Sequence, residues 1–251
     1  MSETTNAGTP AEGPSAPRSR RARRLRLAGD LLLIVGGLVL SYPFWSAAYA
    51  QVQQSRLDST YQAQSAAFDG SARARLGAGS RAVPTRVLVA DLARLYGRKL
   101  KPGDPLGRLV IPRIHLDRVV QQGVGGKMAL DPAGDRALLR NGPVHYGVTP
   151  LPGAGEPFAV AGHRTTYGAP FYDLDKLRSG DRIWVETPYA RFRYRFVKST
   201  VVDPSDVSVL ADRGYGLVLT TCTPPYSAAH RLVVWAALEK IRVVRAVRRR
   251  S

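Results

Sequence analysis

Two β-type runs joined by a loop occupy residues 217–241, LVLTTCTPPYSAAHRLVVWAALEKI. The first run, LVLTTC (217–222), is stopped by the TPP that follows, because proline cannot donate to a strand ladder. The second run, RLVVWAALEKI (231–241), begins nine residues after Cys222. A loop of that length lets the chain return antiparallel, so Arg231 is expected near Cys222 where the two strands open into the loop.

Other β-type runs precede this pair, and helical patterns are few. They are GRLVIP (107–112), HLDRVVQ (115–121), FAVAGH (158–163), RIWVET (182–187) and RFRYRFVKSTVVD (191–203). Together the runs make about eight short strands without an internal repeat. Their spacing predicts one mostly β domain over residues 105–243, built as a closed barrel or a sandwich.

The N-terminal region has the composition of a membrane anchor. Residues 1–26 form a predicted disordered tail that ends in a dense arginine cluster, Arg18–Arg26. Residues 27–50 are the predicted anchor, and from Leu31 to Ala50 no residue is charged. Twenty helical residues span about 30 Å, the thickness of a bilayer core. The arginine cluster should remain cytoplasmic, which places the rest of the chain outside the cell.

A cleaved signal peptide is the alternative interpretation, because Ala48-Tyr49-Ala50 is an acceptable cleavage site. Both interpretations export the remainder of the chain. Residues 51–104 are expected to form an extracellular stalk or linker, in which VLVADLARLYG (87–97) has apolar residues at helical spacing. The tail 244–251 is basic and predicted to be solvated.

Charge and cysteine content narrow the classes of function. The formal net charge is +18, which favours an anionic partner such as nucleic acid, anionic lipid or an acidic polymer. No zinc-ligand spacing, recognition-helix pattern or aromatic–basic RNA-binding signature is present, so nucleic acid is not expected as a partner. The single cysteine, Cys222, excludes an intramolecular disulfide and a cysteine-cluster metal site. A lone thiol in an exported protein is either an inert buried group or a reactive one.

Three residues could together form a cysteine catalytic site. A cysteine nucleophile needs a base that generates the thiolate and a donor that stabilises the oxyanion on the attacked carbonyl. Cys222 ends a strand and opens into a loop, a common position for catalytic residues. His163 also lies where an apolar run becomes polar, and it is the candidate acid/base. Arg231 is the candidate oxyanion stabiliser.

His145, in GPVHY, is the second choice for the acid/base. Side chains alternate along a strand. If Arg231 faces the site, Val233 and Trp235 therefore face it as well, and His230 faces away from it.

These motifs resemble those of the sortases. LTTC (219–222), with an arginine nine residues later in HRLVV, resembles the sortase pattern TLxTC followed by a strand arginine. GHR (162–164) resembles the sortase histidine segment. Val218 departs from the pattern, which usually has threonine there, at a position that is not catalytic. The resemblance covers about 105–240 and implies a closed eight-stranded β-barrel with short helices, preceded by one transmembrane helix.

Two longer segments, GHRTTYGAPF (162–171) and TCTPPYSAAHRLVVWA (221–236), are most similar to class E sortases of high-GC Gram-positive bacteria. Class C pilin-polymerising sortases share the Cys–Arg spacing but usually carry a second, C-terminal membrane segment. The run 231–241 is too short for such a segment and carries charges.

The resemblance implies a reaction and its partners. A sortase cleaves an LAxTG- or LPxTG-like sorting motif between Thr and Gly through a thioacyl-enzyme on Cys222, and a peptidoglycan amine resolves that intermediate. His163 exchanges the protons and Arg231 holds the oxyanion, in a family whose active pair is thought to be thiolate with imidazolium. No cofactor or metal is required. The implied partners are secreted proteins with C-terminal sorting signals, the acceptor amine and the cell membrane.

Substrate recognition is expected near the same strands. Tyr146, in the loop before His163, is a candidate for lining the site that reads the second motif residue, and Thr220 and Thr221 are candidate substrate-binding residues. Two other functions remain open from the sequence. One is a cysteine hydrolase in which water replaces the amine, and the other is a non-enzymatic, membrane-tethered domain that binds wall polymer.

Overall fold

The computed structural model describes residues 20–76, 84–125, 136–155, 157–212, 214 and 216–244. The chain divides into two units, residues 1–42 and residues 43–251. The predicted disordered start of the N-terminal tail, through residue 19, and the predicted basic tail after Val244 lie outside the described residues.

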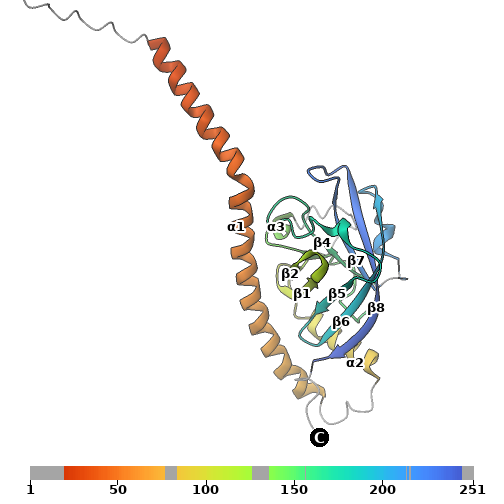
Figure 1. The fold of residues 1–251 in the computed structure, drawn as a ribbon. Helices are drawn as coiled ribbons and strands as arrows, with labels where there is room; N and C mark the ends of the chain where they lie inside the picture. Colours follow the sequence, from red (N-terminus) through yellow and green to blue (C-terminus); the bar gives the residue numbers. More distant parts are fainter. Residues whose placement is uncertain are drawn as a thin grey trace, which may run out of the picture. The chain divides into compact units, whose positions relative to one another are not determined.

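The strands of the described chain close into an eight-stranded β-barrel, which confirms the predicted fold class (Figure 1). They are β1 (Pro105–Ile111), β2 (Leu116–Gln122), β3 (Val144–His145), β4 (Phe158–Ala161), β5 (Arg182–Glu186), β6 (Ala190–Val202), β7 (Leu217–Thr223) and β8 (His230–Val243). Their order around the barrel is β1-β2-β3-β4-β7-β8-β6-β5. β2–β3 and β4–β7 pair in parallel, and β1 closes the barrel by pairing antiparallel with β5.

Alternation along the strands builds two apolar layers. On β7, Leu217 and Leu219 belong to the large core cluster, whereas Val218 belongs to a second cluster on the opposite face of the strand. On β8, Val234 joins the large core and Trp235 joins the second cluster. The period of two therefore gives β7 and β8 an outer face that is itself covered by protein. The short helices are α2 (Thr85–Gly97), α3 (Arg136–Leu139), η2 (Pro112–Ile114), η4 (Leu174–Lys176) and η5 (Val207–Leu210).

The N-terminal helix α1 runs from Arg20 to Leu76. In the first unit its apolar side chains are exposed, including Leu31, Leu32 and Leu33. By length and composition, α1 is the single helix of the described chain that could cross a membrane.

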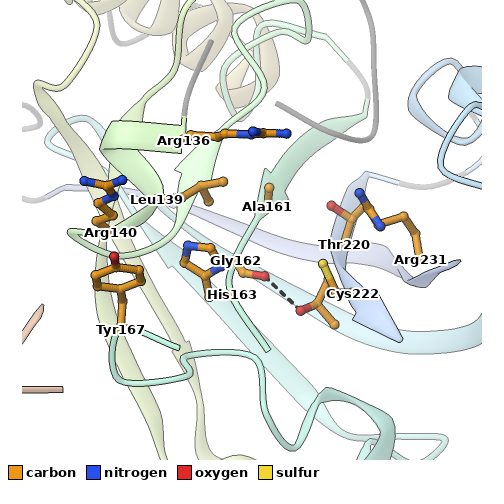
Figure 2. A pocket seen from close by; sticks show the side chains of 11 residues that line it. Arg136, Leu139, Arg140, Ala161, Gly162, His163, Tyr167, Thr220, Cys222 and Arg231 are labelled. Atoms are coloured by element: carbon orange, nitrogen blue, oxygen red, sulfur yellow. Dashed lines mark hydrogen bonds between the residues drawn. The ribbon is translucent and has the colours of Figure 1, made fainter. Parts of the chain in front are cut away.

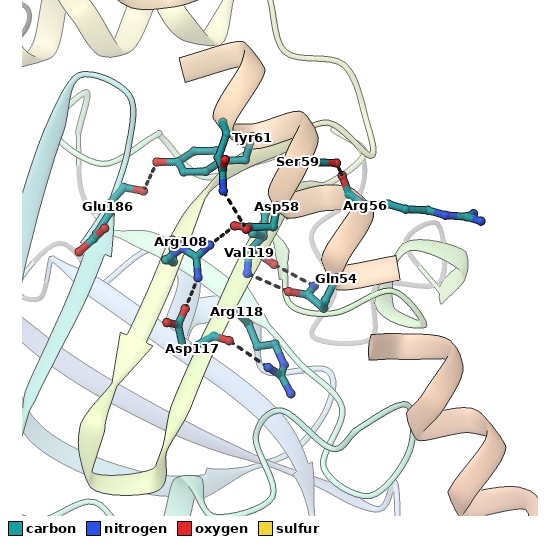
Figure 3. Close-up of polar contacts among 11 residues, drawn as sticks. Gln54, Arg56, Asp58, Ser59, Tyr61, Arg108, Asp117, Arg118, Val119 and Glu186 are labelled. Atoms are coloured by element: carbon teal, nitrogen blue, oxygen red, sulfur yellow. Dashed lines mark hydrogen bonds and ion pairs between the residues drawn. The ribbon is translucent and has the colours of Figure 1, made fainter. Parts of the chain in front are cut away.

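The part of α1 in the second unit packs on the barrel, although the sequence suggests a stalk here (Figure 3). The Gln54 side chain donates to the Val119 carbonyl at 3.2 Å and accepts from the Val119 amide at 2.9 Å. β3 pairs with β2 only at Gln121 and Gln122, so among the described residues no strand pairs with the Val119 backbone on that side. Gln54 thus supplies the two hydrogen bonds that a longer β3 would supply.

Ion pairs and aromatic rings extend this contact along α1. Asp58 contacts Arg108 of β1, and the Tyr61 hydroxyl donates to the Glu186 carbonyl at 3.1 Å (Figure 3). Phe68 lies edge-on to Tyr96 of α2, with ring centroids 5.1 Å apart, and both side chains are buried in the large core cluster. The predicted helix at 87–97 is therefore present and packs on the barrel, together with the end of α1.

Candidate active site

The register of three neighbouring strands brings Cys222, His163 and Arg231 together. Cys222 of β7 is directly opposite Arg231 of β8 in the antiparallel ladder. On the other side of β7, β4 pairs in parallel with a constant offset that ends at Ala161–Thr220. Figure 2 shows the consequence, with Cys222 lying between His163 and Arg231.

Two hydrogen bonds extend the β4–β7 pairing by one residue. The Gly162 amide donates to the Thr220 carbonyl at 3.1 Å, and the Thr221 hydroxyl donates to the Gly162 carbonyl at 2.8 Å. The next residue on each strand is His163 and Cys222, respectively. Thr221 therefore aligns the segment that contains His163 with the end of β7.

The three residues share one pocket of about 250 Å³. Its lining combines the ends of β4, β7 and β8 with the α3 region and the loop after His163. The lining residues are Arg136, Leu139, Arg140, Ala161, Gly162, His163, Tyr167, Thr220, Thr221, Cys222 and Arg231. The free thiol of Cys222 is half-buried, so a substrate can reach it.

Arg231 is buried and held in place by backbone carbonyls. Its exposed fraction is 6%, and its Nη1 donates to the Ala228 carbonyl at 2.9 Å and to the His230 carbonyl at 3.1 Å. Val233 and Trp235 lie on the same face of β8, in the outer cluster, as strand alternation predicts. His230 is exposed and does not line the pocket.

His163 lies against Tyr167 of the loop that follows it, with ring centroids 5.4 Å apart. The Arg140 guanidinium lies over the Tyr167 ring, 5.9 Å from the ring centroid. Burial, and to a smaller extent the charge of Arg140, lower the pKa of His163 below its ordinary value. The neutral imidazole is therefore the favoured form at neutral pH.

The backbone around His163 is shaped by close packing. The Phe171 ring lies within 2.6 Å of the position that a Cβ on Gly162 would take, so a side chain there would displace the ring. The Phe171 amide donates to the His163 carbonyl at 3.1 Å. Arg164 is buried and pairs with Asp175 at 2.9 Å, which attaches the same loop to η4. In the GHR segment, Gly162 and Arg164 thus fix the backbone on either side of His163, whose side chain lines the pocket.

The candidate substrate residues differ in their access to the pocket. Thr220 and Thr221 both line it. Tyr146 is buried, and it is absent from the residues that line the pocket. Its hydroxyl instead lies 2.7 Å from the Thr220 hydroxyl in a buried hydrogen bond. The structure therefore places Tyr146 beside Thr220, a residue of the pocket wall, and not on the wall itself as the sequence predicts.

Arg136, Arg140 and Tyr167 line the pocket, but the sequence patterns did not single them out. Tyr167 lies only four residues after His163 and in the same quoted segment, so loop proximity could have indicated it. Arg140 follows α3, and no spacing in the sequence relates α3 to β4 or β7. Among the described residues, no group of three or more His, Cys, Asp or Glu side chains could hold a metal ion.

His145 is buried away from the pocket. Its ring nitrogens lie 3.1 Å from Gln122 Oε1 and 3.0 Å from Thr149 Oγ1, and its ring stacks on Phe158 at 4.9 Å. Burial, opposed only in part by backbone hydrogen bonds, lowers the pKa of His145 from 6.5 to about 3. These contacts give His145 a structural position in the barrel wall, and His163 is the histidine that faces Cys222.

The buried neutral His145 should make stability depend on pH. Below pH 6.5 the unfolded chain binds a proton at this residue and the folded chain does not, so stability falls as the pH decreases toward 3. At pH 5 the expected loss is about 2 kcal/mol of unfolding free energy. Urea unfolding of the full chain in detergent at pH 7 and pH 5 measures it. His145→Gln should lose this component, and His115→Asn, at an exposed site, should keep it. An unchanged pH dependence in His145→Gln would contradict the assignment.

Comparisons with known proteins agree with this geometry. The model of the sortase domain matches residues 109–239, slightly more than half of the chain. The chain belongs to the sortase family. Among curated sortases, it is 28% identical to Sortase SrtE1 of Streptomyces coelicolor over 90% of this chain and 64% of that sequence. It is 27% identical to Sortase SrtE2 of the same organism over 92% of this chain and 88% of that sequence.

A solved sortase is similar in fold as well. The SrtF sortase from Corynebacterium diphtheriae matches with a TM-score of 0.51 and 26% identity, over 58% of this chain and 90% of that chain. Since sortases are cysteine transpeptidases, the family explains the placement of a half-buried thiol beside an imidazole and a buried guanidinium. The resemblance to class E sortases noted in the sequence agrees with the two SrtE relatives.

Proposed function

We propose that this sortase is a membrane-anchored transpeptidase that joins secreted proteins to a peptidoglycan amine through a thioacyl-enzyme on Cys222. The observation that carries the proposal is that His163, just after β4, Cys222 of β7 and Arg231 of β8 line one pocket. Nucleophile, acid/base and oxyanion donor are the three groups that acyl transfer by cysteine requires. The resemblance of segments 162–171 and 221–236 to class E sortases implies a sorting motif of the LAxTG or LPxTG type.

In the first half-reaction, the Cys222 thiolate attacks the carbonyl carbon between Thr and Gly of the motif. The carbonyl oxygen becomes an oxyanion, and the guanidinium of Arg231 stabilises it. When the tetrahedral intermediate collapses, the C–N bond breaks and the His163 imidazolium gives its proton to the leaving glycine amine. The product is a thioester between the motif threonine and Cys222.

In the second half-reaction, the amine of the peptidoglycan acceptor attacks the thioester carbon. Neutral His163 takes the amine proton, Arg231 again holds the oxyanion, and the C–S bond breaks to release the Cys222 thiolate. A new amide joins the sorted protein to the acceptor. The imidazolium that results is the form that protonates the next leaving amine, so the two half-reactions restore the same pair.

The lowered pKa of His163 has a consequence for this cycle. The reaction starts from imidazolium and thiolate, but burial and Arg140 favour the neutral ring. The active pair is then a minority of the resting enzyme at neutral pH, as the family resemblance implies.

Removal of the Arg140 charge should therefore raise the pKa of His163. We expect this for Arg140→Gln, measured by NMR titration of the His163 ring protons in a Cys222→Ala background that removes coupling to the thiol. Arg113→Gln removes an exposed charge outside the pocket and should leave the pKa of His163 unchanged. An unchanged pKa in Arg140→Gln would show that burial alone lowers it, and a lower pKa would contradict the proposed effect of the Arg140 charge.

Tyr146 and Thr220 are proposed to influence the enzyme's selectivity for the second residue of the sorting motif, alanine or proline. The hydrogen bond between their hydroxyls fixes the Thr220 side chain in the pocket wall. Tyr146→Phe removes this bond but keeps the ring that packs in the outer cluster. A changed ratio of LAxTG to LPxTG turnover in Tyr146→Phe would support the role, and an unchanged ratio in both Tyr146→Phe and Tyr146→Ala would refute it.

The membrane topology is also a proposal, with α1 as a single span, a cytoplasmic N-terminus and an extracellular barrel. Helix α1 continues without a break past Ala50, which is buried and lies beside Gly168. This packing supports a retained anchor over cleavage after Ala50. Protease added to intact protoplasts should digest the barrel and spare the N-terminus. A mature chain that begins at Gln51 would establish the signal-peptide alternative instead.

The proposed function is tested by incubating the full chain, in detergent, with a panel of sorting-motif peptides, with and without an amine such as triglycine. Mass spectrometry should detect a thioester on Cys222 with motif peptides, and a transpeptidation product only when the amine is present. Scrambled peptides of the same composition are the control. Hydrolysis at equal rates with and without amine would favour the hydrolase alternative, and the absence of any thioester would refute the proposal.

A further inference from the structure

A second concave site lies on the outer face of β5, β6 and β8, away from the catalytic pocket. A groove of about 140 Å³ is lined by Trp184, Arg191, Arg193, Lys240 and Arg242; we call it the basic groove. On β8, nine residues separate Arg231 from Lys240, so the groove begins about 30 Å along the strand from the catalytic arginine. None of its residues lines the catalytic pocket.

Strand register explains how the groove forms. One row across the sheet places Trp184 opposite Arg193, and Arg193 opposite Lys240. In the next row, Arg191 is opposite Arg242. Paired positions project from the same face, and the alternate residues of β6, such as Phe192, point into the barrel core. The groove therefore combines one aromatic ring with four cations on a rigid part of the sheet.

The carboxylates nearby that the structure describes pair with only two of the four cations of this groove. Glu186 pairs with Arg191 at 2.7 Å, and Glu239 pairs with Arg193 at 3.0 Å. Within the part of the chain that the structure describes, no ion pair includes Lys240 or Arg242. Like charges placed directly opposite on neighbouring strands are destabilising, as in Arg193–Lys240 and Arg191–Arg242. A bound anion would relieve this repulsion, which makes the groove suited to an anionic ligand.

The shape and the aromatic ring narrow the class of anion. Trp184 is half-buried in the groove and offers a flat apolar surface between charged side chains. The groove is formed by β5, residues 190–196 of β6 and residues 236–243 of β8. Among the described residues, none of these segments has a large exposed apolar side chain. A face without protruding apolar groups is poorly suited to insertion into a bilayer. The concave groove is better suited to a ligand with a sugar ring, which would pack against Trp184, and with phosphate groups, which would contact the cations, than to a bilayer surface.

We propose that the basic groove binds a glycan chain that carries phosphate groups, and so holds the barrel to an anionic polymer of the cell envelope. Arg242 suits a bidentate contact to phosphate and Lys240 supplies a point charge, whereas Arg191 and Arg193 add positive charge while paired with Glu186 and Glu239. The two rows are about 7 Å apart along the strands, so one chain can contact both. This binding is independent of the catalytic residues and would confine the enzyme near its acceptor polymer.

The test measures binding of the full chain in zwitterionic nanodiscs to dextran phosphate, to neutral dextran of equal length and to inorganic polyphosphate. Wild type should bind dextran phosphate, with an affinity that falls as salt increases, and should not bind dextran. The double variant Lys240→Ser/Arg242→Ser should weaken binding by about tenfold or more. Trp184→Ala should weaken binding to dextran phosphate several-fold but leave polyphosphate affinity unchanged, because polyphosphate has no sugar ring.

A matched variant separates the groove from net charge. Arg113→Ser/Lys176→Ser removes two exposed charges that do not line the groove. Its affinity for dextran phosphate should equal that of wild type, and all variants should form the Cys222 thioester at wild-type rates. Equal loss in both double variants would overturn the proposal in favour of a diffuse charge effect. Groove-dependent binding to phosphatidylglycerol vesicles without binding to dextran phosphate would overturn it in favour of the membrane.

Discussion

Cys222→Ala is expected to form no thioester with any sorting-motif peptide while keeping the wild-type fold. Loss of the nucleophile in a cysteine or serine enzyme lowers turnover by roughly 10⁴-fold or more. The chain has no other cysteine that could substitute for it. The side chain is half-buried at the end of β7, so alanine leaves only a small void, and the unfolding free energy should change by less than about 1.5 kcal/mol.

Two further measurements make this result specific. Intact-mass spectrometry after treatment with iodoacetamide should show one added group on wild type and none on Cys222→Ala. Cys222→Ser keeps the size and a hydroxyl group, but a hydroxyl is a far weaker nucleophile than a thiolate, so it should also be inactive. Thermal melts of the variants verify the fold. Transpeptidation by a folded Cys222→Ala protein would exclude Cys222 as the nucleophile.

The barrel was predictable because its strands follow a period of two. Alternation along RLVVW indicates that Val233 and Trp235 share a face with Arg231, and the structure has them on that face. The nine-residue separation of Cys222 and Arg231 indicates a return of the chain, and the two residues are directly opposite. These inferences need only the local geometry of strands and loops, so they can be made from the sequence alone.

The packing of α1 on the barrel was not predictable in the same way. Gln54, Tyr61 and Phe68 contact the barrel at seven-residue spacing, which is a helical stripe. Two of the three are polar, and their hydrogen bonds go to backbone groups of β2 and β5 that the sequence does not reveal. A stretch rich in Gln, Ser, Ala and Arg therefore resembles a solvated stalk until the position of the barrel is known.

The sequence favoured His163 over His145 because His163 follows the apolar run FAVAG, whereas His145 lies in GPVHY. The register that brings His163 to Cys222 was not predictable. The parallel pairing of β4 with β7 places His163 beside Cys222, whereas β3 places His145 against Gln122 and Thr149. Parallel pairing joins segments far apart in sequence, so no local pattern encodes it. The same reason hides Arg140, whose proximity to His163 depends on where α3 docks.

Arg231→Lys and Arg231→Ala are expected to separate oriented hydrogen bonding from charge. A guanidinium presents donors in a fixed planar fork, whereas lysine has a single ammonium group on a mobile stem. The bonds from Arg231 Nη1 to the Ala228 and His230 carbonyls fix the orientation of this fork at the pocket. Lysine cannot reproduce both those bonds and a directed contact to the oxyanion. Turnover should therefore fall by ~10²–10³ in Arg231→Ala, and by nearly as much in Arg231→Lys.

Steady-state kinetics and thermal melts distinguish the possible roles of Arg231. The Michaelis constant for the motif peptide should change less than the turnover number, because the contact is strongest in the transition state. Since Arg231 is buried and bonded to the loop, its loss should also lower stability, by about 1–3 kcal/mol. Arg164→Ala is the matched control. Arg164 is equally buried but pairs with Asp175 outside the pocket lining, so its loss should reduce stability with a smaller effect on turnover. Near-wild-type turnover in Arg231→Lys would show that only charge matters, and a fully active Arg231→Ala would leave the oxyanion without its proposed donor.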